Sequence, residues 1–271
     1  MRSSKLVRSV VALAAMTCAG IASATAVYPD FTVDTSALGG GGKLGTFTAN
    51  DISGQYHEQL TFTSASTFTV SLDFVAQGFN YDDTDASLSN SFNAAQTGLG
   101  LNYGLLATLQ GTGTYSTVGG VTSFSLTPGG TLTLSYDDGA NASFVAPAAP
   151  GGAFTIAANG DTITTLATGN AMVGAGSVSC TAPNLCGSFG QESSFALTPA
   201  GSSFFVAPNP FFGLALQSGQ FEGFPVVVGS TVTSSGSLNA VFTSPVPEPG
   251  SSALLGVALL GFLGTRYRRR A

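Results

Sequence analysis

The sequence predicts a mainly β protein whose body is an antiparallel β-sandwich of jelly-roll type. Three observations favour this class: apolar and polar residues alternate with a period of two, turn residues recur about every 8 to 15 positions, and Thr, Val, Phe and Gly outnumber the strong helix formers. Only 8% of the 271 residues are charged and 44% are hydrophobic, which excludes a wholly disordered chain.

The first 26 residues are predicted to be a signal peptide. A basic start leads into the apolar run Val10–Ala22, which is too short to span a membrane comfortably. Small residues at Ala24 and Ala26 then form an A-x-A cleavage signal, so we expect a cleaved signal helix and a mature chain that begins at Val27. The predicted localisation follows: the signal peptide directs export of the chain.

Residues 27–245 are predicted to be one secreted β-rich domain. The run 67–74 alternates strictly, and Gly119-Gly120 separates two alternating runs, which predicts a hairpin. Asp137-Asp138-Gly139 predicts a second hairpin. Further strands are expected at 114–118, 121–126, 131–136, 142–145, 162–166, 203–207, 224–232 and 238–242, a helix at 86–96 and a loop at 146–152. A β-solenoid is a less favoured alternative because no fixed repeat is present.

The charges of the body are almost all negative. Between Val27 and Val246 there are 13 acidic residues and one cation, Lys43. Such a body repels nucleic acid and anionic lipid, so no nucleic-acid partner is expected. His57 is the single histidine, which excludes zinc sites of two or more histidines. His57-Glu58 has the residue types of an acid–base pair. An isolated His is more often structural, however, so we assign no catalytic residue.

Removal of the signal peptide leaves two cysteines, Cys180 and Cys186. Their C-x5-C spacing encloses a turn-forming insert and fits neither the C-x-x-C redox motif nor a zinc shell. In an oxidising compartment we expect a structural disulfide, worth about 2 kcal/mol in the chain-entropy model.

Asp82, Asp83 and Asp85 form the strongest candidate for metal binding. Carboxylate oxygens are the ligands that Ca²⁺ prefers, but the segment is not an EF-hand, because Ala94 stands where the bidentate Glu is required. The alternative is a solvated acidic turn. Calcium is therefore the single cofactor considered.

Residues 246–271 have three parts in order. Pro247 and Pro249 hold the backbone around Glu248 extended, as a protease cleft requires. The apolar run 253–264 is predicted to be a short transmembrane helix. Arginines follow, and the positive-inside rule places them in the cytoplasm. The predicted arginine cluster is Arg266, Arg268, Arg269 and Arg270.

These three parts together resemble the PEP-CTERM sorting signal. The resemblance covers about the last 26 residues and implies an exosortase, a membrane protease-transpeptidase, as partner, with Pro247, Glu248 and Pro249 as the residues it recognises. It also implies transient anchoring in the inner membrane of a Gram-negative bacterium that makes extracellular polysaccharide. Gly250-Ser251 stands where many members have Ser-Thr, a minor departure.

The body has a second resemblance, to flocculation-associated PEP-CTERM proteins of sludge bacteria. It is carried by strand and turn residues at 31–34, 47–52, 59–63 and 101–105. This resemblance implies a role in bacterial aggregation through the polymer matrix.

We therefore expect a non-enzymatic surface or matrix protein that is processed by exosortase and associates with exopolysaccharide in flocs or biofilms. One alternative is a secreted glycan-active enzyme, which requires two carboxylates about 5 Å or about 6.5–9.5 Å apart in a cleft. The other alternative is a calcium-bridged adhesin. In that case, chelation of Ca²⁺ would abolish the aggregation that the protein causes.

Overall fold

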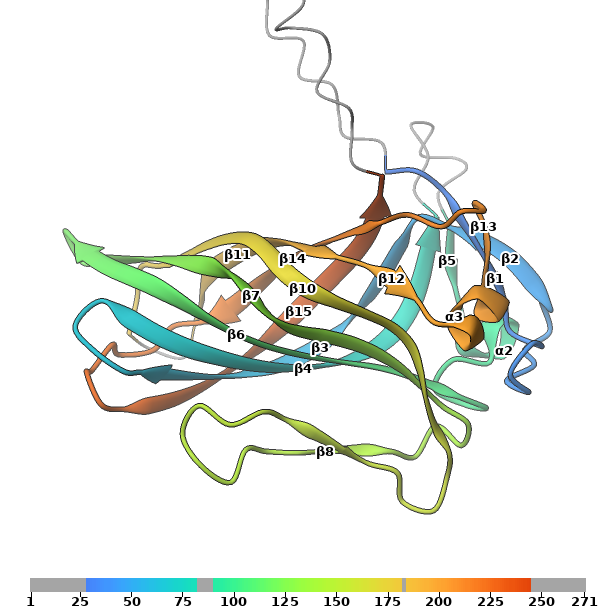
Figure 1. Cartoon of the computed structure of the whole chain (residues 1–271), viewed down its shortest axis with the longest axis horizontal. Coiled ribbons are helices and arrows are strands. Elements are labelled where there is room, and N and C mark those ends of the chain that lie inside the picture. Colours follow the sequence, from blue (N-terminus) through green and yellow to red (C-terminus); the bar gives the residue numbers. More distant parts are fainter. Residues whose placement is uncertain (1–27, 82–89, 182–183, 245–271) are drawn as a thin grey trace, which may run out of the picture.

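Eight strands form an up-and-down antiparallel barrel in the computed structural model, which describes residues 28–81, 90–181 and 184–244 (Figure 1). Each strand pairs with the next along the chain, and β15 pairs with β3 while β10 pairs with β11, so the sheet closes on itself. The barrel strands are β3 (Asp51–Phe62), β4 (Thr67–Tyr81), β6 (Gly104–Val118), β7 (Val121–Asp137), β10 (Ile163–Val178), β11 (Leu185–Ser194), β14 (Leu214–Glu222) and β15 (Thr231–Thr243).

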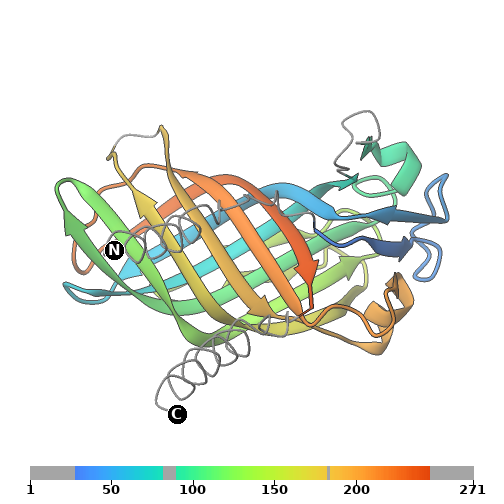
Figure 2. The same cartoon turned by 90° about the horizontal axis from the view of Figure 1, so that it is seen from above.

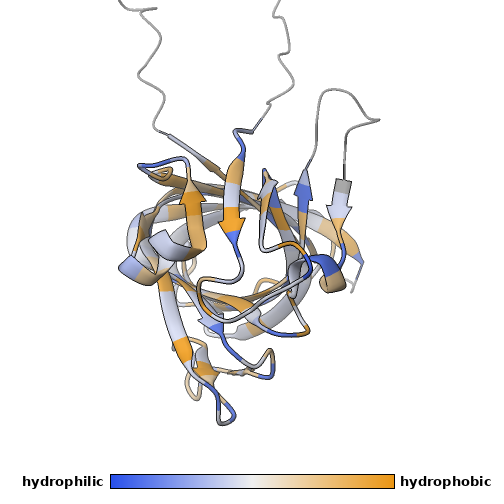
Figure 3. Cartoon of the chain, turned by 90° about the vertical axis from the view of Figure 1, so that its right-hand side faces the viewer, coloured by the Kyte–Doolittle hydropathy of each residue, from blue (hydrophilic) through white to orange (hydrophobic). Residues whose placement is uncertain are grey.

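The prediction of a sandwich or jelly roll is wrong in its architecture, although the mainly β class is confirmed. Sandwiches and barrels share the same alternation and hairpin signals, and they differ in whether the first and last strands pair. Here His57 of β3 lies opposite Ser235 of β15, which is far away in the sequence. Seen end-on, the strands form a ring (Figure 3). The predicted signal helix and transmembrane helix lie outside the described residues.

One end of the barrel, which we call the lid end, is covered by a small sheet and two short helices (Figure 2). Phe31 and Phe205 from the small sheet pack edge-on against Phe242 of β15, with ring centroids 5.2 and 5.8 Å apart. The elements here are β1 (Phe31–Asp34), β2 (Thr46–Ala49), β5 (Asn90–Phe92), α2 (Ala94–Thr97), β12 (Ala196–Leu197), α3 (Pro199–Phe204) and β13 (Phe205–Ala207). Of the helix expected at 86–96, residues 86–89 lie outside the described residues and 90–92 belong to β5, so the part confirmed is the single turn α2, capped by Asn93.

The chain between β7 and β10 forms a flap on the outside of the barrel, built on β8 (Ser143–Val145) and β9 (Thr155–Ala157), which contacts β4 and β6 (Figure 1). The amide of Gln110 donates to the carbonyl of Gly151 (3.0 Å), and the backbone N–H of Phe154 donates to Ser71 Oγ (2.9 Å). The predicted hairpin across Asp137-Asp138-Gly139 is therefore wrong, because β7 pairs with β6 and β10 while β8 pairs with β9.

The opposite end of the barrel, which we call the loop end, carries the turns between β3 and β4, β6 and β7, β10 and β11, and β14 and β15. The predicted Gly119-Gly120 hairpin is confirmed: Val118 pairs with Val121, and both glycines have positive φ, which other residues rarely adopt. The strand expected at 224–232 is confirmed only from Thr231, since residues 223–230 form a loop.

Aromatic rings inside the barrel lie directly opposite glycines of the neighbouring strand. Phe189 faces Gly219, and Tyr56 faces Gly236. A methyl group added at Gly219 would lie 2.6 Å from both the Phe189 ring and the carbonyl of Ser237. The rings fill the space that the missing side chains leave, which explains why glycine stands at these strand positions.

Gly219→Ala is expected to destabilise the barrel by about 1–3 kcal/mol, because the added methyl displaces a buried ring and a strand. Urea unfolding measures the loss. Gly190→Ala is the matched control, since a Cβ there meets nothing within 4 Å and its φ is not positive. Equal midpoints for the two variants would contradict this account of the glycines.

Candidate functional site in the barrel interior and on its wall

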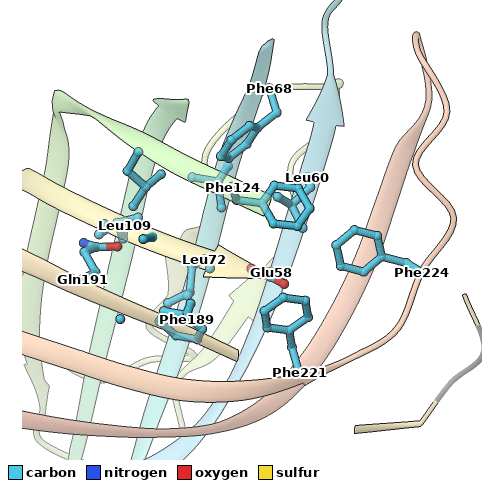
Figure 4. Close-up of a pocket in the computed structure, with 16 residues that line it drawn as sticks. Glu58, Leu60, Phe68, Leu72, Leu109, Phe124, Phe189, Gln191, Phe221 and Phe224 are labelled. Carbon is cyan, nitrogen blue, oxygen red and sulfur yellow. The ribbon is translucent and has the colours of Figure 1, made fainter. Parts of the chain in front are cut away.

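Two adjoining cavities lie inside the barrel. We call them the loop-end chamber and the lid-end chamber, and each has a volume of ≈ 60 Å³. Leu72, Leu109, Phe189 and Gln191 line both and so form the partition between them. The loop-end chamber also has aromatic walls, formed by Phe68, Phe124, Phe221 and Phe224 (Figure 4).

Glu58 is the one carboxylate among the described residues that line either chamber. It lies on the inward face of β3 between Tyr56 and Leu60, and Leu72 and Ser234 are its register partners on β4 and β15. The residue is 7% exposed, and no described group hydrogen-bonds its Oε1. Figure 4 shows its carboxyl oxygens beside the Phe221 and Phe224 rings.

This position changes the protonation of Glu58. Burial in apolar surroundings penalises the charged form and raises the pKa of the Glu58 carboxyl from 4.5 to about 8. Burial, and then the negative charge of Glu58 when it is ionised, raise the pKa of the Tyr56 phenol. The Tyr56 hydroxyl donates a hydrogen bond to the carbonyl oxygen of Gln220 at 3.1 Å. At neutral pH the chamber therefore holds a mostly protonated carboxyl group.

The neighbouring His57 lies on the outer face of the barrel, so the structure separates the His57-Glu58 pair considered from the sequence. His57 Nδ1 lies 3.1 Å from Asp73 Oδ1, with the His57 side chain 60% exposed and that of Asp73 3% exposed. Burial raises the pKa of the Asp73 carboxyl, and the hydrogen bonds and charge of His57 oppose that rise. This pair links β3 to β4 outside the chambers.

The predicted disulfide between Cys180 and Cys186 is confirmed and lies at the loop end, between β10 and β11. Replacing both cysteines with serine is expected to lower the free energy of unfolding by about 2 kcal/mol, because the unfolded chain gains loop entropy. Chemical unfolding with and without reductant checks this. Reduction of the wild-type chain should reproduce the loss, and unchanged midpoints in both experiments would contradict it.

The structure brings together a group of acids that sequence reasoning did not assemble. Oxygens of Asp137, Asp138 and Asp161 lie within 4.8 Å of one another at the base of the flap. Backbone N–H groups donate hydrogen bonds to two of these carboxylates: Ala142 to Asp137 (2.8 Å) and Thr162 to Asp138 (2.8 Å). A role in stabilising turns therefore accounts for Asp137 and Asp138. The predicted calcium ligands Asp82, Asp83 and Asp85 lie outside the described residues.

The outer wall carries an uncharged polar row, which we call the polar belt. Its members are direct register partners on successive strands, about 4.8 Å apart, as neighbouring strands are. Six are exposed and Ser177 is half-buried. The belt consists of Ser116, Ser123, Ser177, Ser188, Gln220, Ser237 and Gln55.

Sequence reasoning did not identify Glu58 as an interior residue, although a signal was present. Tyr56, Glu58, Leu60 and Phe62 share one face of a strand by period-two alternation, and the first, third and fourth are strongly apolar. The polar belt had no such signal, because its members meet only through the register of strands far apart in the chain.

The comparisons with known proteins concern the C-terminal end. Residues 245–270 match the PEP-CTERM protein-sorting motif, which contains Pro247, Glu248, Pro249 and the arginine cluster, all outside the described residues. No curated protein and no solved structure matches the chain. Within the described ranges, no helix is long and apolar enough to cross a membrane. The chain therefore carries a PEP-CTERM sorting motif at its C-terminal end, and this motif implies processing by exosortase and sorting to the surface.

Proposed function

We propose that the protein is a non-enzymatic component of the extracellular matrix whose barrel wall associates with a neutral exopolysaccharide. The polar belt is the observation that carries this proposal. Hydroxyl and amide side chains at a regular spacing can hydrogen-bond successive sugar hydroxyls, and short Ser side chains lose little entropy when they are ordered. The neighbouring row is polar in two stretches, which are Thr114 with Ser125 and Ser218 with Asn239 and Ser53. Ala175 and Gly190 separate these two stretches.

The charge of the wall favours a neutral polymer. Lys43 is the one Lys or Arg among the described residues, and the acids of the body outnumber it. An anionic polysaccharide would meet repulsion without cationic partners. The glycan-active alternative requires two facing carboxylates, and the described lining of the chambers offers Glu58 alone. The calcium-bridged adhesin remains an alternative that rests on Asp82, Asp83 and Asp85.

Co-sedimentation of the full chain with dextran, a neutral polymer, and with alginate, an anionic one, tests this proposal. We expect binding to dextran, and an about 30-fold loss of affinity in the double variant Ser188→Val, Ser237→Val, because two hydrogen bonds of about 1 kcal/mol each are removed. The matched control is Thr46→Val, Thr48→Val, which removes two exposed hydroxyls from β2 at the lid end.

Each other outcome has a distinct meaning. Stronger binding to alginate, or equal affinities for the belt and lid variants, would overturn association through the belt. Binding that requires added Ca²⁺ and disappears on chelation would favour the adhesin instead.

A further inference from the structure

We propose that the loop-end chamber binds a small apolar molecule that carries an ammonium group, with the carboxylate of Glu58 as its counter-ion. This binding activity is independent of the polysaccharide association, because it uses the inside of the barrel rather than its wall.

The position of Glu58 leaves its carboxyl group available to a ligand. Ser234, the register partner on β15, donates its hydroxyl to the carbonyl of Glu222 (3.2 Å). Gln191, the other polar side chain of the chamber, donates its amide to Ser193 Oγ (2.8 Å). Glu58 Oε1 therefore faces the cavity with no described donor, a costly arrangement that a ligand with N–H groups would relieve.

The side chains that line the chamber determine which kind of ligand, apart from its N–H groups, the chamber can bind. Apart from Glu58 and Gln191, the side chains that line the loop-end chamber are apolar, and they include the rings of Phe68, Phe124, Phe221 and Phe224. The faces of aromatic rings attract cations, so a carboxylate among them favours an ammonium group over a neutral or anionic one. The volume of ≈ 60 Å³ exceeds the roughly 10–15 Å³ that one water requires, so a short alkyl or aryl amine is the class that fits.

The loop end also suits the approach of an apolar molecule. Phe224 lies in the loop after β14, where its ring stacks on Phe221 with centroids 5.7 Å apart and closes the chamber on this side. Around it, exposed apolar side chains occupy the neighbouring turns: Val118, Val121, Leu185, Val227 and Val228. An apolar amine would thus meet an apolar surface before it enters.

Binding is coupled to a proton. At neutral pH the Glu58 carboxyl is mostly protonated, so an ammonium ligand displaces its proton to solvent and binds the carboxylate. The facing side chains from β4, β6, β7, β10, β11 and β14 in the chamber lining carry no ionisable group. Tyr56, on the same strand, interacts electrostatically with Glu58 and stays neutral, because its pKa is raised. Affinity is therefore expected to rise with pH up to about 8.

Titration calorimetry on the full chain tests the proposal with three probes that share one chain length: hexylamine, 1-hexanol and hexanoate. We expect hexylamine to bind at least about tenfold more tightly than the other two at pH 7.5, as a charge-assisted hydrogen bond predicts. In two buffers of different ionisation enthalpy, the wild-type protein should release close to one proton per hexylamine at pH 6.5.

Two variants separate the carboxylate from general charge effects. Glu58→Gln should lose the preference for hexylamine and the proton release, whereas Glu222→Gln removes an acid from the outer face of β14 and should keep both. Equal affinity for hexylamine and 1-hexanol, no binding of hexylamine, or an unchanged preference in Glu58→Gln would each overturn the proposal. The proton count on the wild-type chain decides the matter even if a variant fails to fold.

Discussion

Raising the pH from about 4 to 8 is expected to destabilise the native barrel by several kcal/mol, and Glu58 is the main cause. Its pKa is about 8 in the folded protein against 4.5 ordinarily. Between these values the unfolded chain has lost the Glu58 proton and the folded chain has kept it, so stability falls as pH rises. At 1.36 kcal/mol for each tenfold change in proton affinity, the full loss is roughly 5 kcal/mol.

Urea unfolding of the wild-type chain and of Glu58→Gln across pH 4–9 measures this effect. The variant should be less stable or equal at pH 4 and more stable at pH 8, because the amide that replaces the carboxyl group has no charge to bury. Glu222→Gln, on the outer face, should follow the wild-type curve. Parallel curves for the wild type and Glu58→Gln would show that the carboxyl reaches water in the native state.

Substitution of the sorting triplet is expected to have the second large effect. In the native host, Pro247→Ala with Glu248→Ala should leave nearly all of the protein with its C-terminal tail, because the peptide that exosortase recognises is gone. Intact mass of the surface fraction measures this: wild-type protein should lack Arg266 to Ala271, and the variant should retain them.

Ser244→Ala is the matched control for this experiment. It changes the residue directly before the matched motif and leaves Pro247, Glu248 and Pro249 unchanged, so normal processing is expected. A wild-type mass that still includes the arginine cluster would contradict processing altogether. A measured mass that corresponds to a polypeptide beginning at Val27 would also verify the predicted cleavage after Ala26.

Sequence reasoning predicted local strands well where alternation is strict. The run 67–74 lies within β4, and the Gly119-Gly120 turn joins β6 to β7 as expected. The sequence-based predictions were wrong where one local pattern is compatible with two structures. Phe224 belongs to an apolar run typical of a strand, but its ring closes the loop-end chamber from a loop. Asp137-Asp138-Gly139 does form a turn, but it leads into the flap rather than back along β7.

The closure of the barrel could not be predicted, because it depends on contacts between distant segments. Nothing near His57 indicates that Ser235 lies opposite it, and the pairing of β10 with β11 uses the same alternation that a sandwich would. The candidate sites differ in the same way, by whether they depend on local or on distant residues. The sorting motif and the disulfide are short local patterns and were predicted, whereas the chamber and the polar belt exist only once the strands are in register.

The lid end and the loop end differ in their relation to the C-terminal tail. β15 runs from Thr231 at the loop end to Thr243 at the lid end, and the sorting motif begins at residue 245. Thirteen strand residues span roughly 40 Å. Along the chain the tail therefore follows directly from the lid end of the barrel, whereas the loop-end chamber lies toward the other end of β15. The disulfide lies at the loop end, so this cross-link braces the end of the barrel that is remote from the sorting motif along β15.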